Sequence, residues 1–151
     1  MVSWSNDESS IVDILNDTEN LFKEDNLIYE GKTYSSYDAH NKSYTCEIKK
    51  RTFESYHKYS QEGLILEKKK YIKLLDKAKS TNTEALYINL FTDNKFFIWN
   101  LTELTNKQFD FKWHQMTMNK ATFQSKYNKI EKEVTLLKKE ISIYGKCILY
   151  R

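Results

Sequence analysis

The segment Ser43-Tyr44-Thr45-Cys46-Glu47-Ile48-Lys49 decides the fold, because its polar and apolar residues alternate. Successive side chains of a β-strand point to opposite faces, so the aromatic and apolar side chains share one face while Glu47 and Lys49 share the other. Two interpretations follow from the residues alone. Glu47 and Lys49 are either a catalytic pair or an exposed cross-strand charge pair.

Asp38 lies upstream of this segment, at the end of a strand predicted over residues 33–38. A turn predicted at residues 39–42 makes the two strands a hairpin and brings Asp38 close to Glu47 and Lys49. Two carboxylates suit a hard divalent cation: Mg²⁺ takes oxygen ligands at about 2.1 Å and keeps several waters. Asp38, Glu47 and the Ile48 carbonyl are therefore the candidate metal ligands, with Mn²⁺ as a substitute ion.

The remaining elements are predicted from hydrophobic periodicity and turn residues. Together they give the order α-β-β-β-α-β-β-α-β, a mixed α/β sandwich in one domain over residues 1–151. Residues 1–8 and part of the region 101–123 are expected to lack regular structure. The predicted elements are a helix from Ser9 or Ser10 to Phe22, a short strand at 27–30, a helix at 62–79, a hairpin of 85–91 with 96–101, a helix at 127–141 and a strand at 147–150.

Tyr37-Asp38, a short gap and then Cys46-Glu47-Ile48-Lys49 followed by a helix resemble the PD-(D/E)XK nuclease superfamily over roughly residues 9 to 101. The resemblance implies an αβββαβ restriction-endonuclease-like core, with a mixed central sheet flanked by helices. A C-terminal hairpin strand, helix and strand would extend it. Tyr37 stands where the superfamily motif has its proline.

The same resemblance implies a role for each matched residue. Asp38 and Glu47 would bind the metal, and Lys49 would assist the attacking water. A glutamate of the first helix often joins such a site, and Glu19 is the best candidate here because it borders the apolar stripe; Glu24 is the alternative. Glu-x-Lys also occurs at Glu30 and Glu67, but only Glu47 combines an upstream Asp with an apolar alternate face.

Charge alone does not identify a partner, because 24 Lys and Arg against 21 Asp and Glu give a net charge of only +3. Basic residues nevertheless cluster around the motif and at the start of the following helix, where they would contact phosphates or simply be solvated. Tyr56, His57 and Tyr59 offer stacking groups for an unpaired base, or ordinary loop packing. The candidate nucleic-acid-binding residues are Lys50, Arg51, Gln61, Lys68 and Lys69.

The sequence thus predicts a Mg²⁺-dependent endonuclease or exonuclease that hydrolyses DNA, with branched or recombination intermediates among its substrates, and DNA favoured over RNA. One alternative is a catalytically inactive nuclease-fold module that binds nucleic acid or a protein partner. Another is a structural protein that uses the stripe from Tyr127 to Ile141 as a homodimer seam.

Other function classes find little support in the sequence. A Gly-rich phosphate loop is missing, which disfavours nucleotide hydrolysis. Apolar runs stay short of the roughly 18 residues of a membrane span, and the N-terminus lacks a signal pattern. Cys46 and Cys147 are isolated, which predicts a reducing, cytoplasmic location. The proline-free, Lys- and Asn-rich composition is typical of an AT-rich genome such as that of a phage.

Overall fold

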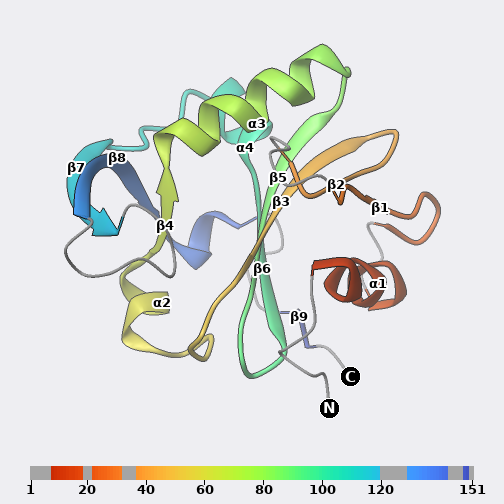
Figure 1. The fold of residues 1–151 in the computed structure, drawn as a ribbon, viewed down its shortest axis with the longest axis horizontal. Coiled ribbons are helices and arrows are strands. Elements are labelled where there is room, and N and C mark those ends of the chain that lie inside the picture. The colour runs from red at the N-terminus through yellow and green to blue at the C-terminus, as the bar shows by residue number, and fades with distance from the viewer. Residues whose placement is uncertain (1–7, 19–21, 32–36, 120–128, 143–147, 150–151) are drawn as a thin grey trace.

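Two sheets organise the computed structural model, which describes residues 8–18, 22–31, 37–119, 129–142 and 148–149. A mixed six-stranded sheet has the order β1-β2-β3-β5-β6-β9, and a three-stranded sheet has the order β4-β8-β7 (Figure 1). The bounds are α1 Glu8–Thr18, β1 Ile28–Tyr29, β2 Ala39–His40, β3 Tyr44–Lys50, α2 Lys58–Glu62, β4 Leu64–Glu67, α3 Lys68–Ser80, β5 Glu84–Leu90, β6 Lys95–Asn100, α4 Leu101–Asn106, β7 His114–Asn119, β8 Lys129–Leu137, the 3₁₀ helix η2 Lys139–Ile141 and β9 Ile148–Leu149.

The large sheet combines antiparallel and parallel pairs. β1, β2 and β3 pair antiparallel, whereas β3 and β5 pair parallel, with Glu47 opposite Tyr87 and Lys49 opposite Asn89. α2, β4 and α3 form the crossover that a parallel pair requires. β5 and β6 form the predicted hairpin, and Ile148 pairs with β6 as expected of a closing strand. The predicted α/β class is confirmed.

Helices cover both faces of this sheet: α1 lies on one side and α3 with α4 on the other (Figure 1). Alternation along β3 explains the division, because Cys46 and Ile48 pack with Ile11 and Leu15 of α1. The other face packs Tyr87 and Trp99 against α3 and α4, and β4 and β8 contribute to the same cluster. Glu47 and Lys49 belong to that second face. The polar pair therefore lies under α3.

The helix predicted over residues 62–79 is wrong in its first part. Gly63 has a φ of 122° and ends α2, and the next residues form strand β4, which pairs with β8. Leu64 and Leu66 are buried at alternating positions, so tertiary pairing outweighs the helical pattern that continues from Lys68. The helix proper begins at Lys68.

The helix predicted over residues 127–141 is also wrong. The homodimer seam predicted on that helix is therefore wrong as well. Residues 129–137 form β8, paired with β7 on one side and with β4 on the other. Ile130 and Val134 are four apart, a spacing that places residues on one face of a helix and equally on one face of a strand. Pairing with two neighbours decided for the strand. Tyr127 lies outside the described residues.

The region 101–123 is more regular than predicted. α4 begins at Leu101 and is capped by Asn100, whose side chain accepts a hydrogen bond from the Glu103 N–H at 2.9 Å, and residues 114–119 form β7. The turn predicted at residues 39–42 is shifted, because Ala39 and His40 are already in β2. Asn41 closes the turn by accepting hydrogen bonds from the Ser43 and Tyr44 N–H groups.

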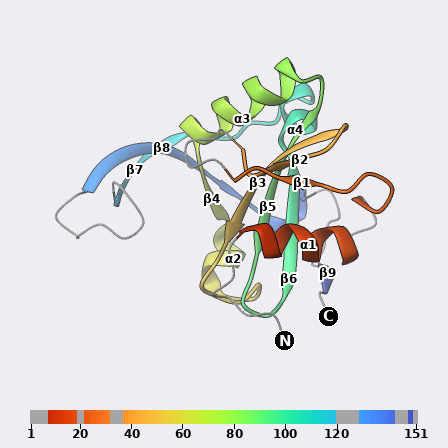
Figure 2. The same cartoon turned by 45° about the vertical axis from the view of Figure 1, so that its right-hand side comes forward.

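The small sheet carries a ribbon of β7 and β8 that reaches away from the body of the molecule (Figure 2). β8 pairs with β4 over residues 134–137 and with β7 over residues 129–134, so its first half belongs to the ribbon alone. Within the described part of the chain, no helix is long and apolar enough to cross a membrane.

Candidate functional site

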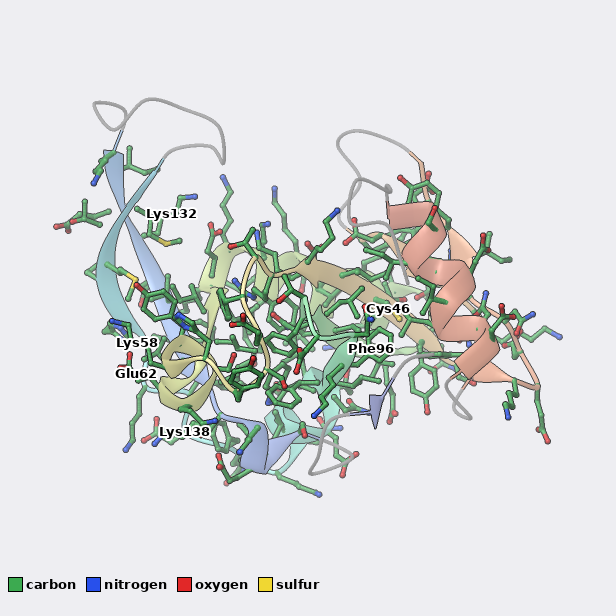
Figure 3. The ribbon with its side chains drawn as sticks, turned by 90° about the horizontal axis from the view of Figure 1, so that it is seen from below. Cys46, Lys58, Glu62, Phe96, Lys132 and Lys138 are labelled. Atoms are coloured by element: carbon green, nitrogen blue, oxygen red, sulfur yellow. The ribbon has the colours of Figure 1, made fainter. Side chains whose placement is uncertain are left out.

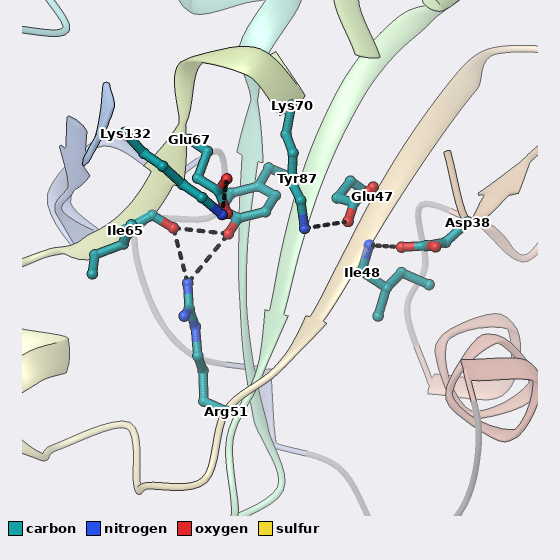
Figure 4. A network of polar contacts seen from close by, with 9 residues as sticks. All are labelled: Asp38, Glu47, Ile48, Arg51, Ile65, Glu67, Lys70, Tyr87 and Lys132. Carbon is teal, nitrogen blue, oxygen red and sulfur yellow. Dashed lines mark hydrogen bonds and ion pairs between the residues drawn. The ribbon is translucent and has the colours of Figure 1, made fainter. Parts of the chain in front are cut away.

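Asp38 is held beside β3 by the hairpin that the sequence predicts. The pairing of Ala39 with Cys46 continues to Asp38, whose N–H donates to the Cys46 carbonyl at 2.8 Å. The Ile48 N–H in turn donates to Asp38 Oδ2 at 2.7 Å (Figure 4). This second bond fixes the carboxylate at the edge of the central strand, next to Glu47.

Glu47 is a buried acid with a raised pKa. Burial, and after it the negative charge of Asp38, raise the pKa of Glu47 to about 7. Lys70 and Lys49 act in the opposite direction, and the Lys70 Nζ lies 3.9 Å from Glu47 Oε2. Two carboxylates that repel each other in a poorly solvated place favour a proton or a cation between them.

Lys49 projects from the same face of β3, two residues after Glu47. Burial lowers its pKa, and the positive charges of Lys70 and Arg51 lower it further. A lysine with a lowered pKa is closer to the neutral amine that can accept a proton. Lys49 is therefore a candidate proton acceptor.

Lys70 completes the group, and the sequence prediction missed it. It precedes the buried Leu74 by four residues on α3, so both side chains lie on the helix face that is turned toward the sheet. The helix predicted over residues 62–79 already contained this spacing, so the sequence held the signal that identifies Lys70. Instead, the predicted contacts were its neighbours Lys68 and Lys69.

Arg51 forms hydrogen bonds with residues of the neighbouring strands beneath the site. Its Nε donates to Asn89 Oδ1 at 2.7 Å, and its Nη2 donates to the Ile65 carbonyl and the Tyr87 hydroxyl (Figure 4). The Tyr87 hydroxyl also donates to the Ile65 carbonyl at 2.9 Å, and burial raises the Tyr87 pKa to about 12, so it stays protonated. Arg51 therefore ties β3, β5 and β4 together, in addition to any contact with a phosphate.

The other predicted residues are scattered. Lys50 is exposed at the end of β3, on the face opposite Glu47. Gln61 lies on α2 and lines a different groove from Lys68 and Lys69. Glu19 lies outside the described residues, and its alternative, Glu24, is exposed.

Phe53 and His57 of the β3–α2 connection pack with Tyr59 of α2. Tyr56 and Tyr59 are 68% and 51% exposed, and the Tyr59 ring packs on Phe53 and His57. The His57 side chain is engaged locally, because its Nδ1 accepts a hydrogen bond from the Tyr59 N–H at 3.2 Å and caps α2. The stacking role predicted for these residues remains a prediction.

A divalent cation fits the donor set of Asp38, Glu47 and Ile48. The N–H and C=O of one strand residue point to the same side of the strand, so the Ile48 carbonyl faces the edge where Asp38 is held. Two carboxylates with one carbonyl are the hard oxygen donors that Mg²⁺ prefers. Among the described residues, no three His, Cys, Asp or Glu side chains gather to hold a metal, so backbone and water oxygens would complete the shell.

The chain matches no family model, no curated protein and no solved structure. Its function is therefore inferred from the chemistry of Asp38, Glu47, Lys49 and Lys70.

Proposed function

We propose that the chain is a Mg²⁺-dependent nuclease that hydrolyses phosphodiester bonds in DNA, branched intermediates included. The observation that carries the proposal is the position of Asp38 at the edge of β3, where the Ile48 N–H holds its carboxylate next to Glu47. Burial, and after it the charge of Asp38, raise the Glu47 pKa to about 7 beside Lys49 and Lys70. Strong perturbation of an acid by burial and by a like charge is typical of functional sites.

Each side chain has a task in this reaction. Asp38, Glu47 and the Ile48 carbonyl would hold the cation, which supplies Lewis-acid polarisation of the phosphodiester and a more acidic water. Lys49, with its lowered pKa, accepts the proton of the attacking water. Lys70, near Glu47, stabilises the negative charge that develops on the phosphoryl oxygens.

The order of the elements supports the proposal. α1, the β1-β2-β3 meander, the crossover containing α3 and the parallel strand β5 follow each other as an αβββαβ core would. Asp38 directly precedes β2, and Glu47 lies on β3. Because one fold hosts many functions, the site chemistry carries more weight than this order.

A catalytically inactive module that binds nucleic acid or a protein is the second candidate. It is favoured by the ion pair between Glu47 and Lys70, because a lysine that already neutralises Glu47 removes part of the need for a metal. The two candidates differ in metal affinity, since only the nuclease requires a cation at Asp38 and Glu47.

The test combines cleavage and metal binding. Labelled single-stranded, duplex and branched DNA are incubated with the protein in Mg²⁺, Mn²⁺ or EDTA, and Mn²⁺ binding is measured by calorimetry. Cleavage with either metal and none in EDTA supports the nuclease. If the protein binds DNA but does not cleave it, and calorimetry detects no Mn²⁺ binding, the inactive module is supported instead.

A further inference from the structure

A groove runs between α3 and the β7–β8 ribbon, and we call it the α3–β8 groove. It is open, has a volume of about 820 Å³ and is lined by Lys69, Lys70, Ile72 and Lys73 of α3 and by Ile130 and Lys132 of β8, among others. Figure 3 shows Lys132 on the ribbon, away from the α2 side of the molecule where Lys58 and Glu62 lie. A groove of this size matches a small ligand or a short run of a chain.

Two ion pairs join the walls of the α3–β8 groove near the start of α3. Lys132 Nζ lies 3.1 Å from Glu67 Oε1, and Lys68 Nζ lies 3.4 Å from Glu133 Oε2. Among the described residues, Lys69 and Lys73 have no acidic partner, and both are exposed. Glu67 and Glu133 are thus neutralised, and Glu131 adds one exposed acid to the β8 wall. Lys69 and Lys73 remain for an anionic ligand.

The groove also exposes two large apolar side chains from facing walls. Ile72 is 46% exposed and Ile130 is 42% exposed, each surrounded by charged residues. A nucleic-acid duplex presents phosphates on its outside, so these side chains would have nothing apolar to cover them. An unpaired strand presents base faces together with phosphates, which suits a groove lined by isoleucines and lysines.

Lys70 connects this groove with the candidate site, because it lines the groove and lies 3.9 Å from Glu47. We infer that the α3–β8 groove binds a segment of single-stranded nucleic acid next to Glu47, with phosphates on Lys69 and Lys73 and bases against Ile72 and Ile130. The inference rests on the proposed function in one respect: the bound single-stranded nucleic acid would be the substrate that approaches Asp38 and Glu47.

The experiment measures binding of a fluorescein-labelled oligodeoxythymidine and of a labelled duplex by anisotropy in EDTA, where no metal-dependent cleavage occurs. Lys69→Glu/Lys73→Glu is compared with Lys42→Glu/Lys79→Glu, which makes the same charge change at exposed lysines outside the groove. We expect the groove variant to lose at least tenfold in affinity for the single strand, and the control to lose little. The slope of log affinity against log salt should fall by about 1.4, because each phosphate contact to a single strand contributes about 0.7.

Ile72→Ala/Ile130→Ala separates base contacts from charge. It should weaken single-strand binding severalfold while leaving the salt slope unchanged, and circular dichroism with thermal unfolding confirms that each variant is folded. Equal affinity of the two lysine variants for the single strand overturns the inference, as does tighter binding of the duplex than of the single strand. If the groove variant loses single-strand binding but the wild type cleaves no DNA, the groove is a binding site and the proposed nuclease activity is wrong. If the wild type cleaves DNA but the groove variant binds the single strand normally, the nuclease proposal stands and the groove inference is wrong.

Discussion

The Lys70 ammonium of α3 lies 3.9 Å from the carboxylate of Glu47 on β3. This pair links the crossover helix to the central strand at the point where Asp38 also approaches. The Glu47 side chain is only 18% exposed, so its charge is poorly screened by water and responds strongly to its neighbours. The balance among two acids and two lysines at this point determines what the site can bind.

Stability should fall with rising pH because of Glu47. Its pKa in the folded protein is about 7, raised by burial and by Asp38, whereas the ordinary pKa of a glutamate is 4.5. Between these values the folded state holds a proton that the unfolded state has released, so stability is lost as pH rises through this window. In the wild type the free energy of unfolding should therefore decline by on the order of 1 to 3 kcal/mol across this window. Glu47→Gln, which mimics the protonated acid, should remove this decline.

Urea unfolding of both proteins at pH 5 and at pH 7.5 measures this effect. Glu62→Gln, an exposed glutamate at the end of α2, is the control and should keep the wild-type pH dependence. An identical pH slope for wild type and Glu47→Gln would show that Glu47 titrates normally.

A divalent cation should stabilise the wild type through Asp38. When the cation is present at 100 times its dissociation constant and binds only the folded state, it raises the free energy of unfolding by about 2.7 kcal/mol. For a chain of this size, that corresponds to a rise of roughly 5 to 10 °C in Tm. Asp38→Asn can still accept the Ile48 N–H but loses the charge, so most of this shift should disappear. Asp76→Asn, at an exposed position of α3, should keep it. Equal Mn²⁺ shifts in the two variants would place the ion elsewhere.

Lys49 should act through its neutral amine. Burial and the charges of Lys70 and Arg51 lower the pKa of Lys49, which favours the neutral amine that can accept a proton. Lys49→Arg puts a guanidinium there, which is always charged and cannot accept a proton. We expect Lys49→Arg and Lys49→Ala to lose kcat alike, by about 10²- to 10⁴-fold, with KM little changed. Single-turnover cleavage measures the loss, and Lys42→Ala is the control. Activity of Lys49→Arg close to wild type would mean that the positive charge is what matters.

Gly63 should be essential to the junction of α2 and β4. Its φ is 122°, and a Cβ there would lie 2.8 Å from Leu136 Cβ of β8. Gly63→Ala should therefore destabilise the fold by about 1 to 3 kcal/mol, because backbone strain and the clash add. Gly31→Ala, whose Cβ would make an ordinary 3.5 Å contact with Tyr29, should change little. Urea midpoints compare the two, and similar losses would contradict the assignment of the junction.

Alternation and turn chemistry predicted what is local and strongly patterned: β3, the β5–β6 hairpin and the approach of Asp38 to Glu47. Lys70 was missed although the predicted helix already placed it four residues before Leu74. The start of α3 was missed because the pairing of Leu64 and Leu66 with β8 sets it, and β8 was missed because the spacing of Ile130 and Val134 fits a helix and a strand equally. Long-range strand pairing decided the last two cases, and a single sequence window does not contain it.

The most direct test of the account is single-turnover cleavage of single-stranded DNA in Mg²⁺ by the wild type, Glu47→Gln and Glu62→Gln. We predict cleavage by the wild type and by Glu62→Gln that EDTA abolishes, and a loss of at least 10²-fold in Glu47→Gln although it still binds the DNA. Cleavage by Glu47→Gln at the wild-type rate, or no cleavage by the wild type on any DNA structure with Mg²⁺ or Mn²⁺, would contradict a nuclease site at Asp38, Glu47 and Lys49.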